Sequence, residues 1–553
     1  MGEFFGLSGL KIQVQKCNIF NFGIDCPDLC PDIEIGRSDK IEYLGNQFDR
    51  FLEFMDENVT KKIEEILEAG KKWSYRFLTP LGRSTIAKSL LIPKICHTLS
   101  VVKISPKVIK NFQQKIYEFI WGGEKKRAAF AREDAQVSSF EGGLNMPDIQ
   151  AALRSYQISW LRRAVNNEEN NVWRNWLDEL LMESNEMTFE QIMLAGNKQW
   201  MKAGNKIKNT FWKEVFKSYN RMVEAMVVKD RSNTLTMTIW DSTLFRSNNR
   251  HLNSRLLRFE GIRHIPITAM DCLGPDGRIL SQNELDLKFG HEVPPEILDA
   301  VSGNLGHITN EPLPRIKTGT VMPFFIPFNY ASITKYKKGC SFWNRHLRRK
   351  KTENIRALEN KNADALGLII DDQRWKQIYW MVSNIKYGND IKWFVHQILR
   401  GCLTTNYILT KMRLRNTDHC TFCRLGVERI RHLFWGCGLV RQFLNSTKDE
   451  LDRICPGYDM GFAPNNHYGR ELFILGDNRA NTGLGPNYLY NVVKKFIWNV
   501  RCRAEENAAT PPALVTRDFW RFLDKRLRED RFLSRRIPEL RFIEEIAIRR
   551  GLG

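Results

Sequence analysis

The sequence predicts a mainly α-helical protein with a small metal-stapled domain towards its C-terminal end. Apolar residues recur at helical spacing from Phe51 onward, whereas strand-like alternation is confined to short pieces in the first 45 residues. One stretch, His419 to Cys437, places Cys and His residues at the spacing of metal ligands. Together these observations favour helical bundles over a sheet-based fold.

Length and charge set the broad class. The 553 residues can bury several cores, and 84 Lys and Arg against 63 Asp and Glu give a net charge of +21. Such an excess suits a phosphate-binding surface, and a merely solvated basic surface is the alternative. We therefore expect RNA and/or DNA as partner. No membrane is expected, because no apolar run approaches about 18 residues, and no small-molecule substrate, because no phosphate-cradling glycine loop is present.

Cysteine usage and targeting signals predict a nuclear or cytoplasmic protein that is not secreted. The twelve cysteines are irregularly spaced, and Cys26 and Cys30 lack a matching second pair, so they are expected to be reduced. No signal peptide is expected, because the first residues lack the pattern of one. Its Met1-Gly2 start does not fit a myristoylation signal, because Gly6 stands where Ser or Thr is required.

The chain divides into five successive segments. Residues 1–48 contain strand-like pieces such as Ser8–Ile12 and Lys40–Gly45, and 49–150 form a helical bundle. Residues 151–335 are a helical connector with loops, in which the tryptophans are expected to pack in a core. Residues 336–475 are a basic helical region with the metal-ligand stretch, and 476–553 are a basic helical tail.

Local signals fix several expected boundaries. A first helix carries Val59, Ile63 and Ile66 on one face, with Gly70 as its C-cap. Pro93 ends the next helix. A third helix begins at Ser105 as N-cap with Pro106 in its first turn. Further on, Ser281 and Glu284 form a capping box, within a stretch that is otherwise interpreted as a loose connector.

Two basic clusters are candidates for nucleic-acid binding. The first follows the glycine pair Gly122-Gly123, and the second mixes cations with aromatic residues around Trp343. An ordinary solvated loop and a self-repelling linker are the respective alternatives. The candidate contact residues are Lys125, Lys126, Arg127, Arg345, Arg348, Arg349, Lys350 and Lys351.

The metal-ligand candidates are Cys420, Cys423, His432 and Cys437. Two cysteines separated by two residues can present both sulfurs to one ion, and a His and Cys five apart, on and just beyond a short helix over 427–434, can close a tetrahedron around Zn²⁺. Four protein ligands leave no open position, so the zinc would be structural. His419 is an alternative ligand. Reduced cysteines packed as small hydrophobes beside a core histidine are the alternative to metal binding.

Several motifs resemble one family of proteins. Three runs are similar to the thumb region of non-LTR (LINE-type) retrotransposon reverse transcriptases. They are Trp73–Ile95, Tyr117–Arg127 and Glu141–Ile149. Ser8–Ile12 and Lys40–Gly45 resemble that family's palm segments. The family's reverse-transcriptase zinc-binding domain is resembled by Leu403 to Asn406, Leu409 and the Cys420–Cys437 stretch. The continuation of that domain is resembled by Phe473–Gly476. The resemblance implies a residual palm segment over 1–48 and a thumb-like bundle over 49–150.

The resemblance also bears on catalysis. In this family, carboxylates that hold two metal ions precede the palm segments, so this chain is not expected to contain them or to copy nucleic acid on its own. Leu368–Asp372, an apolar run ending in two aspartates, lies too far downstream and precedes a helical pattern. Asp477, Glu505 and Glu506 do not form the spaced acids and lysine of a nuclease.

The function expected from the sequence is therefore binding of RNA or DNA by a zinc-stabilised C-terminal part of a LINE-type reverse transcriptase. Two alternatives stay open. The chain can belong to an active RNA-directed DNA polymerase whose catalytic aspartates lie upstream, or it can be a remnant used as a protein-interaction scaffold.

Overall fold

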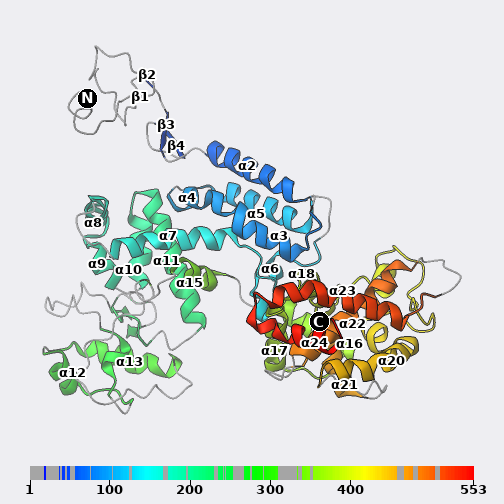
Figure 1. Cartoon of the computed structure of the whole chain (residues 1–553). Coiled ribbons are helices and arrows are strands. Elements are labelled where there is room, and N and C mark those ends of the chain that lie inside the picture. Colours follow the sequence, from blue (N-terminus) through cyan, green and yellow to red (C-terminus); the bar gives the residue numbers. More distant parts are fainter. Residues whose placement is uncertain are drawn as a thin grey trace. The chain divides into compact units, whose positions relative to one another are not determined.

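Helices account for most of the computed structural model of this protein, and its strands are short (Figure 1). The mainly α fold class predicted from the sequence is confirmed. The residues described are 18–19, 36–37, 40–43, 46–49, 56–74, 76–101, 104–123, 128–165, 172–194, 197–229, 235–240, 242, 245–248, 250–252, 267–274, 277–290, 292–308, 333, 339–348, 353–456, 466–477, 484–504 and 511–552.

The described strands form two-stranded pairs only. Strands β1 (Asn18–Ile19) and β2 (Gly36–Arg37) pair in parallel, and β5 (Arg246–Ser247) and β6 (Arg250–His251) pair antiparallel. Strands β3 (Lys40–Tyr43) and β4 (Asn46–Asp49) form an antiparallel hairpin in which Lys40 faces Asp49. The alternation expected over Lys40–Gly45 therefore corresponds to a strand, whereas Ser8–Ile12, Cys26 and Cys30 lie outside the described residues.

The helices up to residue 308 are α2 (Asp56–Ser74), α3 (Pro80–Ile86), η2 (Ala87–Leu91), α4 (Pro93–Val101), α5 (Pro106–Trp121), α6 (Arg132–Gln136), η3 (Ser139–Glu141), α7 (Ile149–Val165), α8 (Val172–Asn185), α9 (Phe189–Leu194), α10 (Asn197–Lys206), α11 (Thr210–Lys229), η5 (Ala269–Cys272), α12 (Gln282–Phe289) and α13 (Pro295–Ile308).

The later helices are α15 (Gly339–Leu347), α16 (Glu353–Leu366), α17 (Asp372–Ser383), α18 (Asn389–Leu399), α19 (Asn406–Lys411), η6 (His432–Gly436), α20 (Gly438–Ile454), α21 (His467–Leu475), α22 (Leu484–Arg503), α23 (Thr516–Ser534), η7 (Pro538–Leu540) and α24 (Arg541–Arg549).

The chain folds into two compact units, each assembled from several segments. Unit 1 comprises Met1–Gly70, Leu90–Ile116 and Asp148–Arg348, and unit 2 comprises Lys71–Ser89, Tyr117–Pro147 and Arg349–Gly553. The division of the sequence into five successive segments, including the palm and thumb parts implied by the resemblance, stays a prediction.

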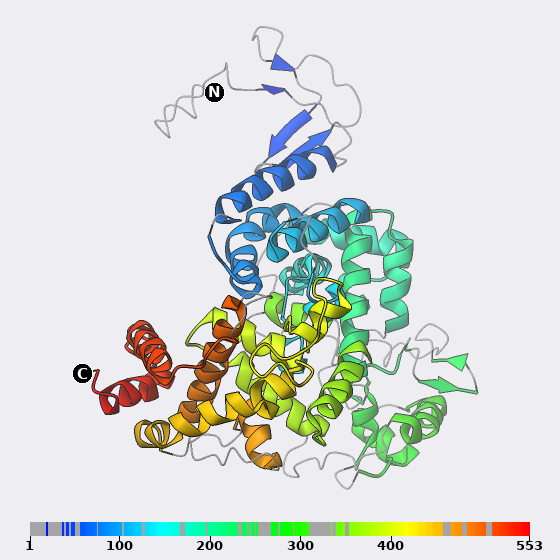
Figure 2. The same ribbon diagram turned by 90° about the vertical axis from the view of Figure 1, so that its right-hand side faces the viewer.

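Unit 1 is built around helices α7, α10, α11 and α15, which pack side by side (Figure 2). Their apolar faces enclose a core that includes the buried Trp200, Trp212 and Trp343. Trp160 packs edge-on against Trp173 at 5.7 Å between ring centroids. The expectation that these tryptophans serve packing is confirmed for the residues of the core, whereas Trp176 is 46% exposed.

A second, smaller core of unit 1 gathers residues between 235 and 301. Trp240, Phe245 and Ile297 are buried in it, together with residues of η5, α12 and α13. The predicted capping box is present, since Ser281 and Glu284 exchange hydrogen bonds at the start of α12. The interpretation of this stretch as a loose connector is therefore wrong for its described part, because its apolar residues are spaced too irregularly to show a helical or strand period.

Unit 2 contains the largest core and all the metal-ligand candidates. Helices α17, α18, α20, α22, α23 and α24 supply most of its buried residues, among them Trp375, Phe434 and Ile497. Helices α23 and α24, which Figure 2 shows side by side, form the basic amphipathic pair expected at this end. Their inward face includes Leu523 and Leu527, both fully buried.

The glycine pair Gly142-Gly143 makes a sharp bend in unit 2. Gly142 has a φ of 89°, in the left-handed region, and a Cβ on it would lie 2.7 Å from the Tyr379 ring. Only glycine satisfies both conditions. The bend is held by Arg400, whose guanidinium donates a hydrogen bond to the Gly142 carbonyl and lies over the Phe130 ring.

One helix boundary differs from expectation. Helix α2 continues past Gly70 to Ser74, so Gly70 is a buried position inside the helix and not its C-cap. Pro93 does end the preceding helical stretch, and it also begins α4. Ser105 caps α5 as predicted, accepting a hydrogen bond from the Val108 amide at 3.4 Å. A glycine within a helical pattern is thus a weak stop signal unless the apolar period also ends there.

We predict that His396 makes unit 2 sensitive to acid. Burial, reinforced by Lys392 and Arg400, lowers the pKa of this α18 side chain from 6.5 to about 3. The unfolded chain therefore binds a proton below pH 6.5 that the folded chain does not bind. Stability should fall by about 1.4 kcal/mol per pH unit between pH 6.5 and pH 3.

The measurement is urea unfolding at pH 7 and at pH 4.5 for the native chain and for His396→Leu. The variant should lose less stability on acidification, by about 3 kcal/mol. His97→Leu, which changes an exposed histidine, is the control and should behave like the native chain. An equal loss in all three proteins would contradict the prediction.

Candidate metal centre

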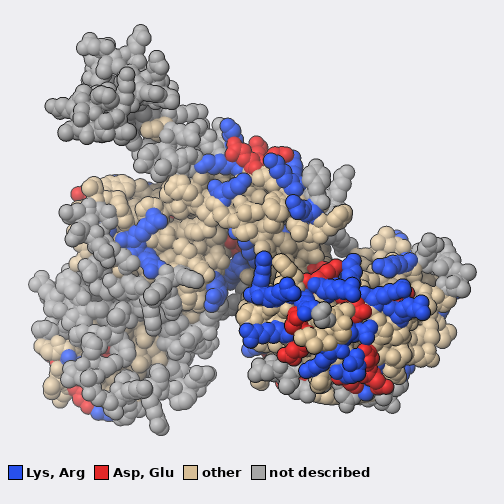
Figure 3. Space-filling view, in the orientation of Figure 1, with Lys and Arg blue, Asp and Glu red and all other residues tan. Residues whose placement is uncertain are grey.

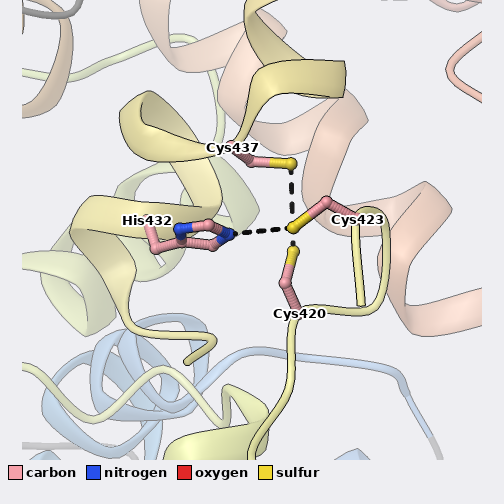
Figure 4. A group of neighbouring side chains, drawn as sticks. All are labelled: Cys420, Cys423, His432 and Cys437. Atoms are coloured by element: carbon pink, nitrogen blue, oxygen red, sulfur yellow. Dashed lines mark hydrogen bonds between the residues drawn. The ribbon is translucent and has the colours of Figure 1, made fainter. Parts of the chain in front are cut away.

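Cys420, Cys423, His432 and Cys437 converge on one point in unit 2 (Figure 4). Their ligand atoms all lie within 4.8 Å of one another. The Sγ atoms of Cys420 and Cys437 are 3.9 Å apart, and Cys423 Sγ lies 3.3 Å from His432 Nε2. All four predicted ligands are therefore brought together. His419, the alternative ligand, is exposed and does not belong to this group.

A tight turn presents the first two sulfurs. The Cys420 amide donates to the Gly426 carbonyl at 2.7 Å, and the Arg424 amide donates to the Cys420 carbonyl at 2.9 Å. A short antiparallel bridge between His419 and Val427 closes the base of the turn. The turn is the knuckle that the two-residue spacing predicts, and its backbone hydrogen bonds hold Cys420 and Cys423 on the same side.

The His ligand comes from the short helix η6, whose turns are wider than those of an α-helix. Leu433 and Phe434 anchor it in the core. A Cβ on Gly426 would lie 2.6 Å from His432 Cε1, so glycine at this position lets the imidazole approach the knuckle. The helix was expected to start at Val427, but Val427 is in the bridge and is 39% exposed, because backbone pairing with His419 takes precedence there.

The donor set fits a tetrahedral metal ion. With metal–sulfur bonds of about 2.3 Å, tetrahedral geometry separates two sulfurs by about 3.8 Å, close to the distance between Cys420 and Cys437. The same distance is far too long for a disulfide, and all described cysteines are free. A hydrogen bond from Cys420 lowers the pKa of the Cys437 thiol, which favours the thiolate that a metal requires. The group can therefore hold a metal ion through four protein ligands.

A buried carboxylate lies directly behind the knuckle. Glu428 is fully buried, and its two oxygens accept from the Asn406 amide at 2.9 Å and from the Thr421 amide at 2.7 Å. The Thr421 hydroxyl donates to it as well, at 2.6 Å. Arg501 of helix α22 completes the set with an ion pair at 2.9 Å, in which the Arg501 side chain is 5% exposed.

Asn406 joins the same network from the start of helix α19. Its side-chain oxygen accepts from Arg501 and from Arg415, each at 2.6 Å, and its side-chain nitrogen donates to the His419 carbonyl at 2.6 Å. The network thus links the knuckle to α19 and to α22, which is far away in the sequence. Every hydrogen-bonding atom of the Glu428 carboxylate has a partner, as a buried charge requires.

Sequence reasoning identified Asn406 through the family resemblance but missed Glu428 and Arg501. The signal for Glu428 was weak: a single acid between apolar Val427 and Ile430, in a stretch otherwise rich in arginine. No local pattern points to Arg501, because its partner is 73 residues away.

The outer surface of this metal-ligand region is cationic. The stretch between residues 405 and 437 has six cations and only two carboxylates, Asp418 and Glu428. The cations are Lys411, Arg413, Arg415, Arg424, Arg429 and Arg431. Glu428 is buried, and all of the cations except Arg415 are exposed. We call these five exposed cations the knuckle cations. Their positive charge exceeds the charge of Asp418, the other carboxylate of the stretch, which is half-buried.

The basic tail has a different character. Over α23 and α24, around the C-terminus, Figure 3 shows Lys and Arg interspersed with Asp and Glu. Arg526 pairs with Asp390 and Asp530, and Arg531 pairs with Glu544 at 2.5 Å. Many cations of the tail therefore stabilise the packing of unit 2 rather than adding to a positive surface.

The sequence-predicted nucleic-acid contacts are only partly described. Six of them lie outside the described residues: Lys125, Lys126, Arg127, Arg349, Lys350 and Lys351. Arg345 is exposed near the end of α15, and Arg348 is half-buried just after it. Trp343, between the cations of this cluster, is fully buried in the core of unit 1. It therefore packs in the protein and is not a surface on which a base can stack.

The acidic residues considered at the sequence level have structural roles where they are described. Asp371 is the N-cap of α17 and accepts from the Arg374 amide at 2.7 Å, which accounts for the acidic end of Leu368–Asp372. Asp477 is buried, and its backbone pairs with the Asn487 side chain. Glu505 and Glu506 lie outside the described residues.

No protein-family model matches this chain. Within the described residues, no helix combines the length and the apolar composition needed to cross a lipid bilayer.

We predict that removing one sulfur from the centre abolishes tight metal binding. Cys423→Ser should leave three strong ligands, and the purified chain should lose its metal to a chelator that the native chain resists. Metal content is measured by plasma emission before and after the chelator. Cys502→Ser, which changes an exposed cysteine outside the group, is the matched control. Equal metal retention in the two variants would refute the ligand set.

The buried carboxylate network yields a second prediction. Glu428→Gln should destabilise unit 2 by about 3–5 kcal/mol, because it leaves the buried Arg501 charge without its counter-ion. Glu539→Gln, which breaks an exposed pair with Lys386, should cost about 0–1 kcal/mol. Urea unfolding monitored by tryptophan fluorescence measures both. Similar urea unfolding midpoints for the two variants would show that the buried ion pair stabilises the fold no more than the exposed ion pair does.

Proposed function

We propose that this chain binds RNA or DNA as part of a LINE-type retrotransposon reverse transcriptase, and that a structural Zn²⁺ shapes its binding surface. The observation that carries the proposal is the pairing of a closed Cys3His group with the knuckle cations. The family assignment is supported by the sequence resemblance on both sides of this region.

The donor set supports zinc as the metal. Three cysteines and one histidine are a common ligand set of structural zinc sites, and thiolates select zinc over harder ions such as Mg²⁺. Because all four positions are taken by protein atoms, the ion has no site for a water or a substrate. Its role in the proposal is to supply folding free energy to a segment that has little apolar core of its own.

The knuckle cations support nucleic acid as the partner. Arg side chains bind phosphates with two parallel hydrogen bonds, and each neutralised phosphate releases condensed counter-ions, which gives affinity independent of sequence. The metal holds the turn that carries Arg424, and the buried network holds α19, at whose end Lys411 lies. These residues bind nucleic acid and carry out no chemical step.

The proposal predicts a steep salt dependence that the knuckle cations control. Affinity of the full chain for a labelled RNA should fall by orders of magnitude between about 50 and 200 mM salt. Arg413→Gln combined with Arg424→Gln should weaken binding and reduce the slope of log affinity against log salt by about 1 to 2, since about two phosphate contacts are lost. Fluorescence anisotropy over a salt series gives both quantities.

The control is Arg517→Gln combined with Arg521→Gln, which removes the same charge from exposed positions of α23. It should leave the slope nearly unchanged. Plasma emission on each protein checks that zinc is retained. A flat salt dependence of the native chain, or equal effects of the two double variants, would overturn the proposal.

A further inference from the structure

A cavity of about 250 Å³ lies within unit 2, beside the metal-ligand region. Its walls come from α16, α17, α18 and α19 and from the residues before η6. Most of the wall is apolar, with Leu358, Leu366, Trp375, Ile398 and Leu399 among its lining residues. The volume is below the range of about 300–1,000 Å³ typical of sites for drug-sized ligands, so the cavity suits a single small ring system.

The lining includes four cations and no carboxylate. Lys361, Lys411, Arg429 and Arg431 are all exposed, so their charged groups reach solvent at the edge of the cavity. None of them forms an ion pair with another residue that the structure describes. A ligand with an apolar body and negative charge outside it is therefore the complementary one.

Tyr407 positions two of these cations. The Lys411 ammonium lies 4.4 Å from the centre of the Tyr407 ring, and the Arg429 guanidinium lies 4.2 Å from it. A hydrogen bond from Lys411, with Arg429 and Lys361 nearby, lowers the pKa of the Tyr407 hydroxyl. These contacts hold two long side chains at the edge of the cavity, which reduces the entropy lost when they bind a ligand.

One polar side chain of the cavity wall makes no capping hydrogen bond. Thr405 is 1% exposed, lines the cavity and stands at the N-cap position of α19, yet its hydroxyl makes no capping hydrogen bond. The residue stands in the cavity wall, where a ring nitrogen or exocyclic oxygen of a ligand can form a hydrogen bond with its hydroxyl.

We propose that this cavity holds one unpaired base of a single-stranded RNA or DNA, with the adjoining phosphates on Lys361, Lys411, Arg429 and Arg431. The inference rests on the nucleic-acid binding proposed above and adds a preference for unpaired strands. A base within a duplex is stacked on both faces and paired through its Watson–Crick edge, so leaving the helix costs a few kcal/mol more than it costs an unpaired base, which can enter an apolar cavity directly. A flat aromatic ring with an attached phosphodiester has the apolar body and outer negative charge that the cavity and its cations require.

The experiment fills the cavity from an exposed position. Ala365 is an exposed residue of α16 that lines the cavity, and Ala365→Trp should block it without disturbing the core. Ala357→Trp places the same side chain on the same helix, at an exposed position that is not part of the lining, and is the matched control. Binding of a single-stranded oligonucleotide and of a duplex of the same length is measured by anisotropy on the full, zinc-loaded chain.

We expect Ala365→Trp to weaken single-strand binding by about 5- to 150-fold, because that is the affinity contributed by one bound base. Duplex binding should change little. Ala357→Trp should match the native chain in both assays. An oligonucleotide carrying 2-aminopurine should change its fluorescence on binding to the native chain and not on binding to Ala365→Trp.

Three outcomes would overturn the inference. Equal single-strand affinity of the two tryptophan variants would show that no base occupies the cavity, while leaving the proposed function intact. No binding of any nucleic acid by the native chain would instead remove the proposed function itself. Loss in Ala365→Trp of binding to an acidic peptide with apolar residues, at unchanged oligonucleotide affinity, would assign the cavity to a protein partner.

Discussion

The ion pair between Glu428 and Arg501 is the interaction on which the C-terminal half of the structure depends. A carboxylate with no exposed surface is stable only if every oxygen is hydrogen-bonded and its charge is compensated. Asn406, Thr421 and Arg501 meet that requirement from three separate stretches of chain. The positions of helices α19 and α22 relative to the knuckle are therefore fixed by one charge, and the metal ligands are held in place from behind.

The metal centre and the network have complementary tasks. The four ligands lie within 18 residues of sequence and organise that short segment only, whereas the network connects the segment to the rest of unit 2. Because the interior side of the knuckle is satisfied by Glu428, its arginines are left to face outward. The outward cations, the cavity beside them and the closed metal site thus follow from the same local arrangement, and they are the basis of the proposed binding function.

Local features could be predicted from the sequence, and long-range ones could not. The four metal-ligand candidates were predictable because each pair is close in sequence: the knuckle fixes the spacing of Cys420 and Cys423, and the helical turn fixes that of His432 and Cys437. The bend at Gly142-Gly143 was predictable because glycine is the residue that tolerates its backbone geometry, although its contact with Tyr379 was not. The buried state of Trp343 was misjudged, since a basic neighbourhood in sequence says nothing about which way each side chain points on α15. The ion pairs of the basic tail could not be predicted, because Asp390 and Glu544 lie on other helices than their partners Arg526 and Arg531.

The separation of Glu428 from Arg501 has a consequence for biosynthesis. The knuckle and its four Cys and His side chains leave the ribosome well before α22 does, so they are available to a metal ion while the nascent chain is still growing. Until residue 501 emerges, the Glu428 carboxylate has no counter-charge and must stay hydrated, which prevents the hydrophobic closure of that half. Burial of the acid therefore follows only after translation has supplied the arginine.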